Sequence, residues 1–514
     1  MTAKTPVFVG IDIGGTFTDV IATGPAGTHI LKVPTTRNDP GVAVLTALEE
    51  LQRQHGIEPS AIIRFAHGTT VATNAVIERK GAKVGLITTK GFRDVLELGR
   101  QIRRQLYDLV LKPETPGWLA PGARRIEVDE RIAADGTVVQ PLDEATVRDA
   151  IARLMAADIE AVAVCLLFSF ANATHEQSIK SIIADVAPHL PVSLSSEVDP
   201  AFREYERTLV TAFDAYIKPV VDAYLERLTT RLDEAGVPAP LQVMQSRGGL
   251  AGATTARKRP VRLFLSGPAA GVIGAAAAGQ SADLPDLITI DVGGTSSDIA
   301  LIAGGQALVR PETDIAGFQV RVPMLDVTTL GAGGGSIAWI DTGGGLRVGP
   351  QSAGADPGPA CYGQGGTAAT VTDASIVLGY LDPGYFAGGR LRLDPQLATK
   401  AIEETVAKPL GMSVIEAALE STASPTLTWP TAFDWSRSIA ATTPANSCLS
   451  LWAARVPCTQ PHWPANSTSR AFWCRAFQVS FPQAASLQHP LSMRSQPHST
   501  PPWHLPPLTT SRPC

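Results

Sequence analysis

The sequence predicts an α/β protein of two domains followed by a tail, and three observations lead to this class. Strand-like and helix-like stretches alternate along the first 420 residues. A segment built around Asp-x-Gly-Gly-Thr occurs twice, each time after an apolar strand. The composition then changes abruptly, because all 46 glycines lie before Ser421 and no Gly, Lys or Glu follows Glu420.

The predicted strands are short apolar runs bounded by turn residues. They cover residues 7–13, 20–22, 84–89, 161–168 and 287–290. Residues 40–51 predict a helix, because Asp39 can cap its N-terminus and Pro40 suits its first turn. The charge-rich residues 201–235 predict a long helix, and the small residues 268–279 predict a helix suited to close packing.

Charge and composition exclude several classes of partner. The net charge is −5 without a basic stripe, which argues against nucleic acid. Apolar runs such as residues 161–170 are far shorter than the roughly 20 residues of a membrane span, and no signal pattern opens the chain. Six cysteines without paired spacing suit a reducing compartment. We therefore expect a cytoplasmic protein.

The internal repeat carries the strongest functional signal. Residues 11–20 read IDIGGTFTDV, and residues 290–299 read IDVGGTSSDI. Two glycines permit a tight turn whose N–H groups can approach phosphate oxygens, and the threonine hydroxyl adds a donor. The leading aspartate can hold Mg²⁺ through water. The alternative is an ordinary hairpin turn, but two copies in matching context favour a nucleotide clamped between two domains.

The paired hairpins resemble the phosphate-binding loops of the actin, Hsp70 and sugar-kinase superfamily. Further segments are similar to a narrower group, the hydantoinase A/oxoprolinase family. They are AHGTTVATNA (66–75), GLITTKGFRD (85–94), QSRGG (245–249), SGPAAG (266–271), GAGGGS (331–336), ADPGPACYG (355–363) and VTDA (371–374). The resemblance covers nearly all of residues 5–418.

This resemblance implies an actin-like (ribonuclease H-like) ATPase fold with an incomplete second domain. It divides the chain into an N-terminal domain at residues 5–190, a truncated second domain at 200–419 and an aberrant, poorly packed tail at 420–514. Members of the family use ATP to open a cyclic amide such as hydantoin or 5-oxoproline, and relatives carboxylate ketones.

The resemblance also assigns roles to individual residues, with ATP and Mg²⁺ as cofactors. Asp12 and Asp291 are expected to be catalytic and to position the metal ion. The residues expected to hold the nucleotide are Gly14, Gly15, Thr16, Gly293, Gly294, Thr295, Gly333 and Gly334. For the run 331–335, a simple bend is the alternative.

Four residues are weaker candidates for substrate contact: His67, Thr69, Thr70 and Arg93. His67 precedes a Gly-Thr-Thr turn, and a hydrogen-bonded structural histidine is the equal alternative. Arg93 belongs to a charged cluster for which a solvated helix face is the favoured interpretation. Two cysteines, Cys165 and Cys361, are interpreted as structural.

The composition of the last 94 residues indicates that this part of the sequence comes from a misread reading frame. Its residues hold six of the eight Trp and four of the six Cys, a composition unlike solvating disorder. Read one base out of phase, the codons of Trp452-Ala453 must give Gly, and those of Trp463-Pro464 must give Ala. With free wobble bases, residues 450–475 begin A-L-G-G-A-G-P, which resembles the adenosine-binding element of the superfamily. We therefore expect the printed chain to be truncated and poorly active.

The sequence leaves three functions open. The first is an ATP-dependent cyclic amidase acting on a small ring amide, with a hydantoinase B-type subunit as its partner. The second is a subunit of a ketone carboxylase, which shares the nucleotide hairpins. The third is a non-catalytic nucleotide-binding protein of the actin-like group.

Overall fold

The computed structural model describes residues 6–14, 17–36, 39–102, 107, 115–354, 356–386 and 391–422, and the backbone of two strands near the C-terminus. The described chain is the mixed α/β structure that the sequence predicts. Three larger sheets organise it, and the first and third of them contain the two repeated segments.

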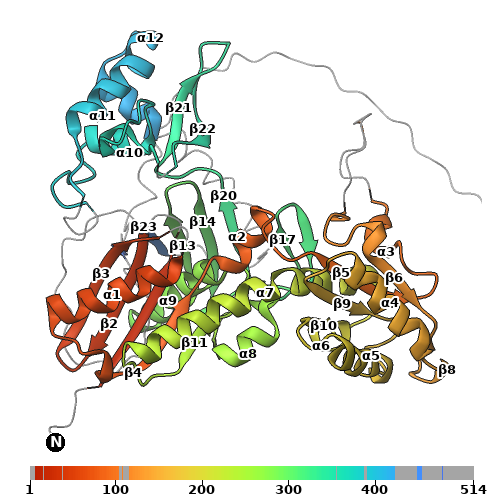
Figure 1. Ribbon diagram of the computed structural model, residues 1–514. Helices are drawn as coiled ribbons and strands as arrows, with labels where there is room; N and C mark the ends of the chain where they lie inside the picture. The colour runs from red at the N-terminus through yellow and green to blue at the C-terminus, as the bar shows by residue number, and fades with distance from the viewer. Residues whose placement is uncertain are drawn as a thin grey trace, which may run out of the picture. The chain divides into compact units, whose positions relative to one another are not determined.

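The first sheet has six strands in the order β12-β11-β4-β1-β2-β3 (Figure 1). β1 pairs antiparallel with β2 and parallel with β4, and β11 extends the parallel part. Strands from both predicted domains therefore share one sheet. Their bounds are β1 Val7–Ile13, β2 Phe17–Gly24, β3 Gly27–Pro34, β4 Ile62–Gly68, β11 Leu241–Met244 and β12 Leu250–Gly252.

Burial alternates along this sheet, and the two faces differ in role. Val9, Ile11 and Ile13 are buried in the core, whereas Asp12 points to the opposite face. The buried face packs against α1 (Pro40–His55), whose buried residues recur at helical spacing. As predicted, Asp39 caps this helix and Pro40 opens it, and Gly56 ends it at a φ of 64°.

The second sheet is parallel, in the order β10-β9-β5-β6. The helices α4 (Glu144–Ala156) and α5 (Thr174–Val186) pack against it. The predicted strand 161–168 ends early at Cys165, because side chains replace its ladder partners. The Leu166 N–H donates to Glu176, and the Leu167 N–H donates to Thr89, both at 3.0 Å. The strands are β5 Val84–Thr89, β6 Arg125–Val128, β9 Ala161–Cys165 and β10 Val192–Leu194.

Two of the predicted helices connect the sheets. α7 (Glu204–Glu234) packs its apolar residues into the same core as the first sheet. α9 (Ser266–Ser281) contacts β4 and β11 of the first sheet and β13 and β14 of the third. Small residues allow this close approach, since a Cβ at Gly279 would lie 2.4 Å from Leu287 Cδ1.

The third sheet repeats the plan of the first. β13 pairs antiparallel with β14 and parallel with β23, as β1 pairs with β2 and β4. β20 pairs with β14 as β3 pairs with β2. The bounds are β13 Leu287–Val292, β14 Ser297–Ala303, β15 Gln306–Ala307, β20 Val327–Leu330, β23 Cys448–Ala453 and β24 Phe477–Gln478.

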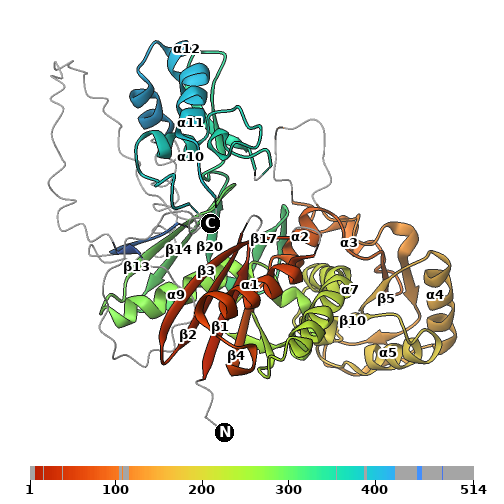
Figure 2. The same ribbon diagram turned by 60° about the vertical axis from the view of Figure 1, so that its left-hand side comes forward.

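The remaining strands form two-stranded ribbons, and the remaining helices are short (Figure 2). The ribbons are β7 (Arg131–Ile132) with β8 (Val138–Gln140), β16 (Val309–Arg310) with β19 (Met324–Leu325), β17 (Thr313–Ile315) with β18 (Phe318–Val320), and β21 (Ser336–Ile340) with β22 (Leu346–Ser352). The helices are α2 (Val71–Ile77), α3 (Val95–Leu98), α6 (Ser195–Val198), α8 (Ala253–Lys258), α10 (Val371–Val377), α11 (Pro395–Ile402), α12 (Lys408–Leu410) and one over residues 414–422.

The predicted lack of packing beyond residue 419 concerns a segment that lies almost wholly outside the described residues. Only the end of the helix over residues 414–422 and the backbones of β23 and β24 are described there. Within the described part of the chain, no helix combines the length and apolarity that a membrane crossing requires.

The cap of α1 generates a stability prediction. Asp39 accepts a hydrogen bond from the Gly41 N–H at 3.2 Å and one from Arg231 of α7 at 2.6 Å. Asp39→Ala should lower the free energy of unfolding by about 1–2 kcal/mol, measured by urea denaturation. The Arg231 hydrogen bond lowers the pKa of Asp39, so the contribution is present at neutral pH and is lost as the pH falls below about 4.

Asp143→Ala is the matched control for capping alone, because Asp143 caps α4 through the Ala145 N–H. Equal losses in the two variants would show that the Arg231 contact contributes nothing.

Candidate functional site

The two repeated segments fold into the same strand-turn-strand unit. In the first, the Gly14 N–H donates to the Phe17 carbonyl at 3.0 Å; in the second, the Gly293 N–H donates to the Ser296 carbonyl at 2.8 Å. Asp12 then lies opposite Asp19, and Asp291 lies opposite Asp298. The sequence repeat is therefore a structural repeat.

Two predicted nucleotide-binding residues, Gly15 and Thr16, lie outside the described residues. The equivalent positions of the second unit, Gly294 and Thr295, are described, and Thr295 is exposed at the turn. A hydroxyl at this tip is accessible to a phosphate oxygen.

The glycine run at residues 331–335 supports the second turn. The Gly334 and Gly335 N–H groups donate to the carbonyls of Gly293 and Gly294, at 2.9 and 2.6 Å. The Gly333 N–H donates to Ser336 Oγ, and a Cβ at Gly333 would lie 2.7 Å from the Ser296 nitrogen. These amides are thus already engaged within the protein. These hydrogen bonds brace the second turn, and contact of Gly333 and Gly334 with nucleotide stays a prediction.

Asp12 sits where three segments meet. A Cβ at Gly68 of β4 would lie 2.5 Å from Asp12 Oδ1, and one at Gly267 of α9 would lie 3.2 Å from it. Glycine is therefore required at Gly68 for the carboxylate to fit. Asp12 Oδ1 is buried and has no hydrogen-bond partner among the described residues. Burial, followed by the negative charge of Asp19, raises the pKa of Asp12 to about 7.

The environment of the Asp291 carboxyl group is similar to that of Asp12. Its Oδ1 is also buried and without a hydrogen-bond partner among the described residues. Burial, followed by the negative charges of Asp298 and Asp12, raises the pKa of Asp291 to about 7. The influence of Asp12 shows that the two hairpins bring their leading carboxylates within electrostatic range of each other.

Two buried carboxylates with unused oxygens fit a bound cation. Mg²⁺ usually takes only one or two protein carboxylates and keeps several waters besides substrate phosphates. Asp12 and Asp291 are the residues that would hold Mg²⁺.

Three further polar residues at the hairpins escaped the sequence analysis. Asp19 and Asp298 occupy the same position of the repeat, so the repeat itself contained the signal for them. Lys32 comes from β3, which lies outside the repeated segment, and it forms an ion pair with Asp19. Only the strand register reveals it.

His67 is a structural residue in this conformation. It is fully buried, its Nδ1 lies 3.3 Å from the Ile11 carbonyl oxygen, and its Nε2 lies 2.8 Å from the Tyr224 hydroxyl. Burial lowers the pKa of His67 to about 4, so the ring is neutral at physiological pH. This geometry fits the hydrogen-bonded alternative rather than substrate contact.

Thr69 fastens the first sheet to α9. Its N–H donates to Ser266 Oγ at 3.1 Å, and the Ser266 hydroxyl donates back to the Thr69 carbonyl at 2.7 Å. Thr70 is half-buried and accepts a hydrogen bond from Asn74 at 3.2 Å. Both threonines lie directly after Gly68, next to Asp12, so they border the hairpin site.

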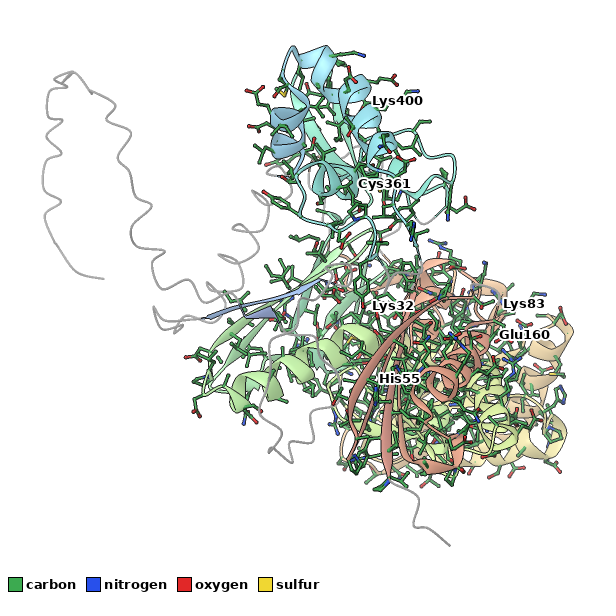
Figure 3. The ribbon with its side chains drawn as sticks, turned by 90° about the vertical axis from the view of Figure 1, so that its left-hand side faces the viewer. Lys32, His55, Lys83, Glu160, Cys361 and Lys400 are labelled. Carbon is green, nitrogen blue, oxygen red and sulfur yellow. The ribbon has the colours of Figure 1, made fainter. Side chains whose placement is uncertain are left out.

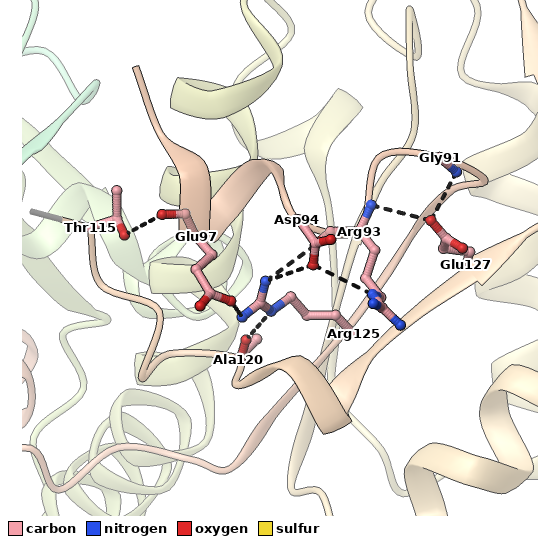
Figure 4. Close-up of polar contacts among 8 residues, drawn as sticks. All are labelled: Gly91, Arg93, Asp94, Glu97, Thr115, Ala120, Arg125 and Glu127. Atoms are coloured by element: carbon pink, nitrogen blue, oxygen red, sulfur yellow. Dashed lines mark hydrogen bonds and ion pairs between the residues drawn. The ribbon is translucent and has the colours of Figure 1, made fainter. Parts of the chain in front are cut away.

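Arg93 belongs to a different neighbourhood, just after β5 of the second sheet (Figure 4). Its N–H lies 3.4 Å from Glu127, its side chain reaches Asp94, and its carbonyl accepts from the buried Arg125. Arg125 also pairs with Glu97. These contacts form an ionic network in which the Arg93 side chain is 51% exposed, as on a solvated face, and substrate contact by Arg93 stays a prediction.

The two cysteines in question are buried. Cys165 lies in β9, and Cys361 is labelled in Figure 3. The Cys361 N–H donates to Asp373 at 2.7 Å, in a set of hydrogen bonds that also caps α10 through Thr370.

A duplicated strand-turn-strand unit with a buried carboxylate at each turn defines an α/β protein with a paired-hairpin site. Comparison with known proteins places it more closely: the chain belongs to the hydantoinase/oxoprolinase family. The model of the hydantoinase/oxoprolinase N-terminal region matches residues 8–187, and the hydantoinase/oxoprolinase model matches residues 207–424.

Individual relatives agree with this assignment. The chain is 41% identical to the caprolactamase subunit alpha of Pseudomonas jessenii over 80% of its own length and 60% of the relative. The crystal structure of the ATP-dependent caprolactamase from that organism is similar with a TM-score of 0.71 at 40% identity, over 82% of this chain and 62% of that one. The nucleotide-free structure of acetone carboxylase, an ATP-dependent enzyme, is similar with a TM-score of 0.69 at 29% identity, over 85% and 63%. The chain thus spans about three fifths of the length of each of these relatives.

The buried carboxylates generate a prediction about stability and pH. A raised pKa in the folded state means that these groups favour folding at low pH, and that this contribution is lost as the pH rises through about 7. In nucleotide-free protein at pH 8, Asp12→Asn or Asp291→Asn should therefore raise the free energy of unfolding by about 2 kcal/mol. The gain should shrink at pH 5.5, where the wild-type carboxyl groups are largely protonated.

Urea denaturation at the two pH values measures this difference. The exposed Asp185→Asn, which pairs only weakly with Arg148, is the control and should change little at either pH. A loss of stability in both hairpin variants at pH 8 would contradict the interpretation, because it would mean that the carboxylates already have favourable partners.

Proposed function

We propose that this chain is the ATP-using subunit of a cyclic amidase, which opens a ring amide such as hydantoin, N-methylhydantoin, 5-oxoproline or a lactam. The observation that carries the proposal is the pair of facing hairpins, each with a buried carboxylate whose oxygen has no hydrogen-bond partner among the described residues. Such a pair suits a Mg-nucleotide, whose phosphates and metal ion supply the missing partners.

ATP solves the chemical problem that a ring amide poses. An unactivated amide is a poor electrophile, because nitrogen donates electron density to the carbonyl and is a poor leaving group. Transfer of the terminal phosphoryl group to the amide oxygen makes the carbon electrophilic. Water can then add to that carbon, and the ring C–N bond breaks as the nitrogen leaves with a proton, which gives a carboxyl phosphate. A second water cleaves this carboxyl phosphate to the carboxylate and inorganic phosphate.

The residues of the chain contribute positioning and charge. The turn amides and Thr295 hold phosphate oxygens, and the glycines at Gly68 and Gly267 let the Asp12 carboxylate approach the backbone. In this proposal Asp291 also orients the attacking oxygen. Mg²⁺, when bound by Asp12 and Asp291, neutralises phosphate charge.

The nature of the relatives favours an amide substrate. The caprolactamase subunit is 41% identical to this chain, whereas the acetone carboxylase structure is 29% identical. A ketone carboxylase subunit is the second candidate, since that structure covers an equal share of the chain. A non-catalytic nucleotide-binding protein is the third. Because the caprolactamase relative is itself a subunit, we infer that a separate B-type subunit completes the enzyme.

Strand register supports the proposal of a misread frame. In the first sheet, Gly68 of β4 lies opposite Asp12, and its missing side chain makes room for the carboxylate. In the third sheet, the equivalent position of β23, opposite Asp291, is Trp452. The alternative reading frame puts Gly at this place. We therefore infer that the chain with the given sequence has only one of the two nucleotide-binding units in working form. The chain read in the other frame would have both.

Sequencing the coding DNA across the codons of residues 417–425 tests the frame directly. A missing or extra base is the expected result. An intact frame would contradict the proposed misreading.

Activity is tested with purified chain, printed and frame-restored, each with its B-type subunit. The frame-restored chain should hydrolyse ATP in the presence of a cyclic amide, and the printed chain should not. Asp12→Ala or Asp291→Ala in the restored chain should lower kcat by about a hundredfold or more. Arg93→Ala, in the separate ionic network, is the control and should keep kcat within a few-fold. ATP turnover that depends on a ketone and bicarbonate instead would favour the carboxylase, and none with any substrate would favour a non-catalytic role.

A further inference from the structure

The strand register extends each hairpin into a row of three side chains on one face of its sheet. In the first sheet Asp12, Asp19 and Lys32 lie opposite one another on β1, β2 and β3. Residues directly opposite on antiparallel strands project to the same face, and adjacent strands are about 4.8 Å apart. The backbone of Lys32 is therefore roughly 10 Å from that of Asp12, within reach of a lysine side chain.

The third sheet has the same row with one difference. Asp291, Asp298 and Thr329 occupy the equivalent positions on β13, β14 and β20. The Thr329 hydroxyl donates to Asp298 at 2.6 Å. The two halves of the site are thus unequal in charge, because only the first row contains a cation.

Lys32 is held close to the first turn. Thr35, three residues further along the chain, donates to the Gly14 carbonyl at 2.9 Å and bonds to Thr18 at 3.0 Å, which ties the end of β3 to the turn. The Lys32 ammonium lies 5.5 Å from the centre of the Phe17 ring and 2.5 Å from Asp19. Its side chain is only 17% exposed (labelled in Figure 3).

The partner of Lys32 is a weak one. The Asp19 side chain is 46% exposed, and ion pairs open to water contribute little to stability. Burial raises the pKa of Asp12 and of Asp291, and the positive charge of Lys32 opposes this rise, so Lys32 acts electrostatically on both carboxyl groups. Lys32 can therefore exchange Asp19 for a stronger anion at small cost.

We propose that Lys32 is a further nucleotide-binding residue, whose ammonium contacts the phosphates at the first hairpin and which Asp19 positions in the absence of nucleotide. The proposal rests on the proposed function, because it takes the hairpins to be the nucleotide site. It also makes the two rows unequal in phosphate contact, because the first row supplies Lys32 where the second row has Thr329. A lysine ammonium is a common point-charge ligand for phosphate.

The competing explanation is a structural cross-strand ion pair with Asp19. That role affects stability and leaves ligand affinity unchanged. Binding measurements with three probes separate the two: Mg-ATP, inorganic tripolyphosphate and adenosine, each titrated calorimetrically into the frame-restored chain. Lys32→Met removes the charge, and Lys32→Arg keeps it. Lys83→Met is the control, since Lys83, just before β5, forms a more exposed ion pair with Asp158 away from the hairpins.

Lys32→Met should weaken the binding of Mg-ATP and tripolyphosphate by about tenfold or more, and adenosine binding should not change. Lys32→Arg should retain most of the affinity, and Lys83→Met all of it. Thermal unfolding without ligand should shift little in any variant, which confirms that each is folded; if Lys32→Met unfolds, the Lys32→Arg and Asp19→Asn variants decide the question. Asp19→Asn should preserve phosphate binding within a few-fold, because it removes only the resting partner.

Each result has a distinct meaning. Unchanged Mg-ATP affinity in Lys32→Met, with binding intact in the wild type, overturns this inference and leaves the proposed function standing. Binding of tripolyphosphate that depends on Lys32, without binding of ATP, supports the inference and contradicts the nucleotide function. If the wild type binds neither Mg-ATP nor tripolyphosphate, the inference about Lys32 and the proposed function are both contradicted. A loss in Asp19→Asn as large as that in Lys32→Met would also overturn the inference, since it would make the ion pair itself the essential feature.

Discussion

The structure depends on the burial of two carboxylates, Asp12 and Asp291, at the turns of two equivalent hairpins. Removing a charged group from water without a partner costs free energy, so each carboxylate is destabilising until a cation or a proton arrives. The neighbouring backbone makes this burial sterically feasible. Gly68 and Gly267 leave space around Asp12, and the run that begins at Gly331 braces the loop beside Asp291.

Much of this arrangement could be predicted from the sequence, because it is local. The duplicated Asp-x-Gly-Gly-Thr segment predicts two hairpins, and both form with matching turn hydrogen bonds. The strands 7–13 and 84–89 begin and end as predicted, and Asp39 caps α1. Local pattern and capping chemistry determine these features, so no knowledge of tertiary contacts was needed.

The remainder depends on contacts between residues far apart in the chain. No local signal showed that β11 extends the first sheet, or that Lys32 lies opposite Asp19. His67 could be interpreted either way, and only its burial against Tyr224 favours a structural role. The hydrogen bonds from the amides of the glycine run to the adjacent loop are likewise a pairing that sequence spacing does not reveal.

The order of strands in the first sheet has a consequence for how the chain folds during synthesis. β4 is an edge strand until β11 pairs with it, and α9 must follow before Ser266 can bond to Thr69. The N-terminal family segment, residues 8–187, therefore leaves the ribosome with an unpaired strand edge and an uncovered apolar face. The strands β11 and β12 and the start of α9, which cover this edge, are complete only after about 80 more residues have been made. At typical rates of synthesis this is a delay of several seconds. Protection of this nascent edge, by a chaperone or by early collapse onto α7, is thus a requirement built into the topology itself.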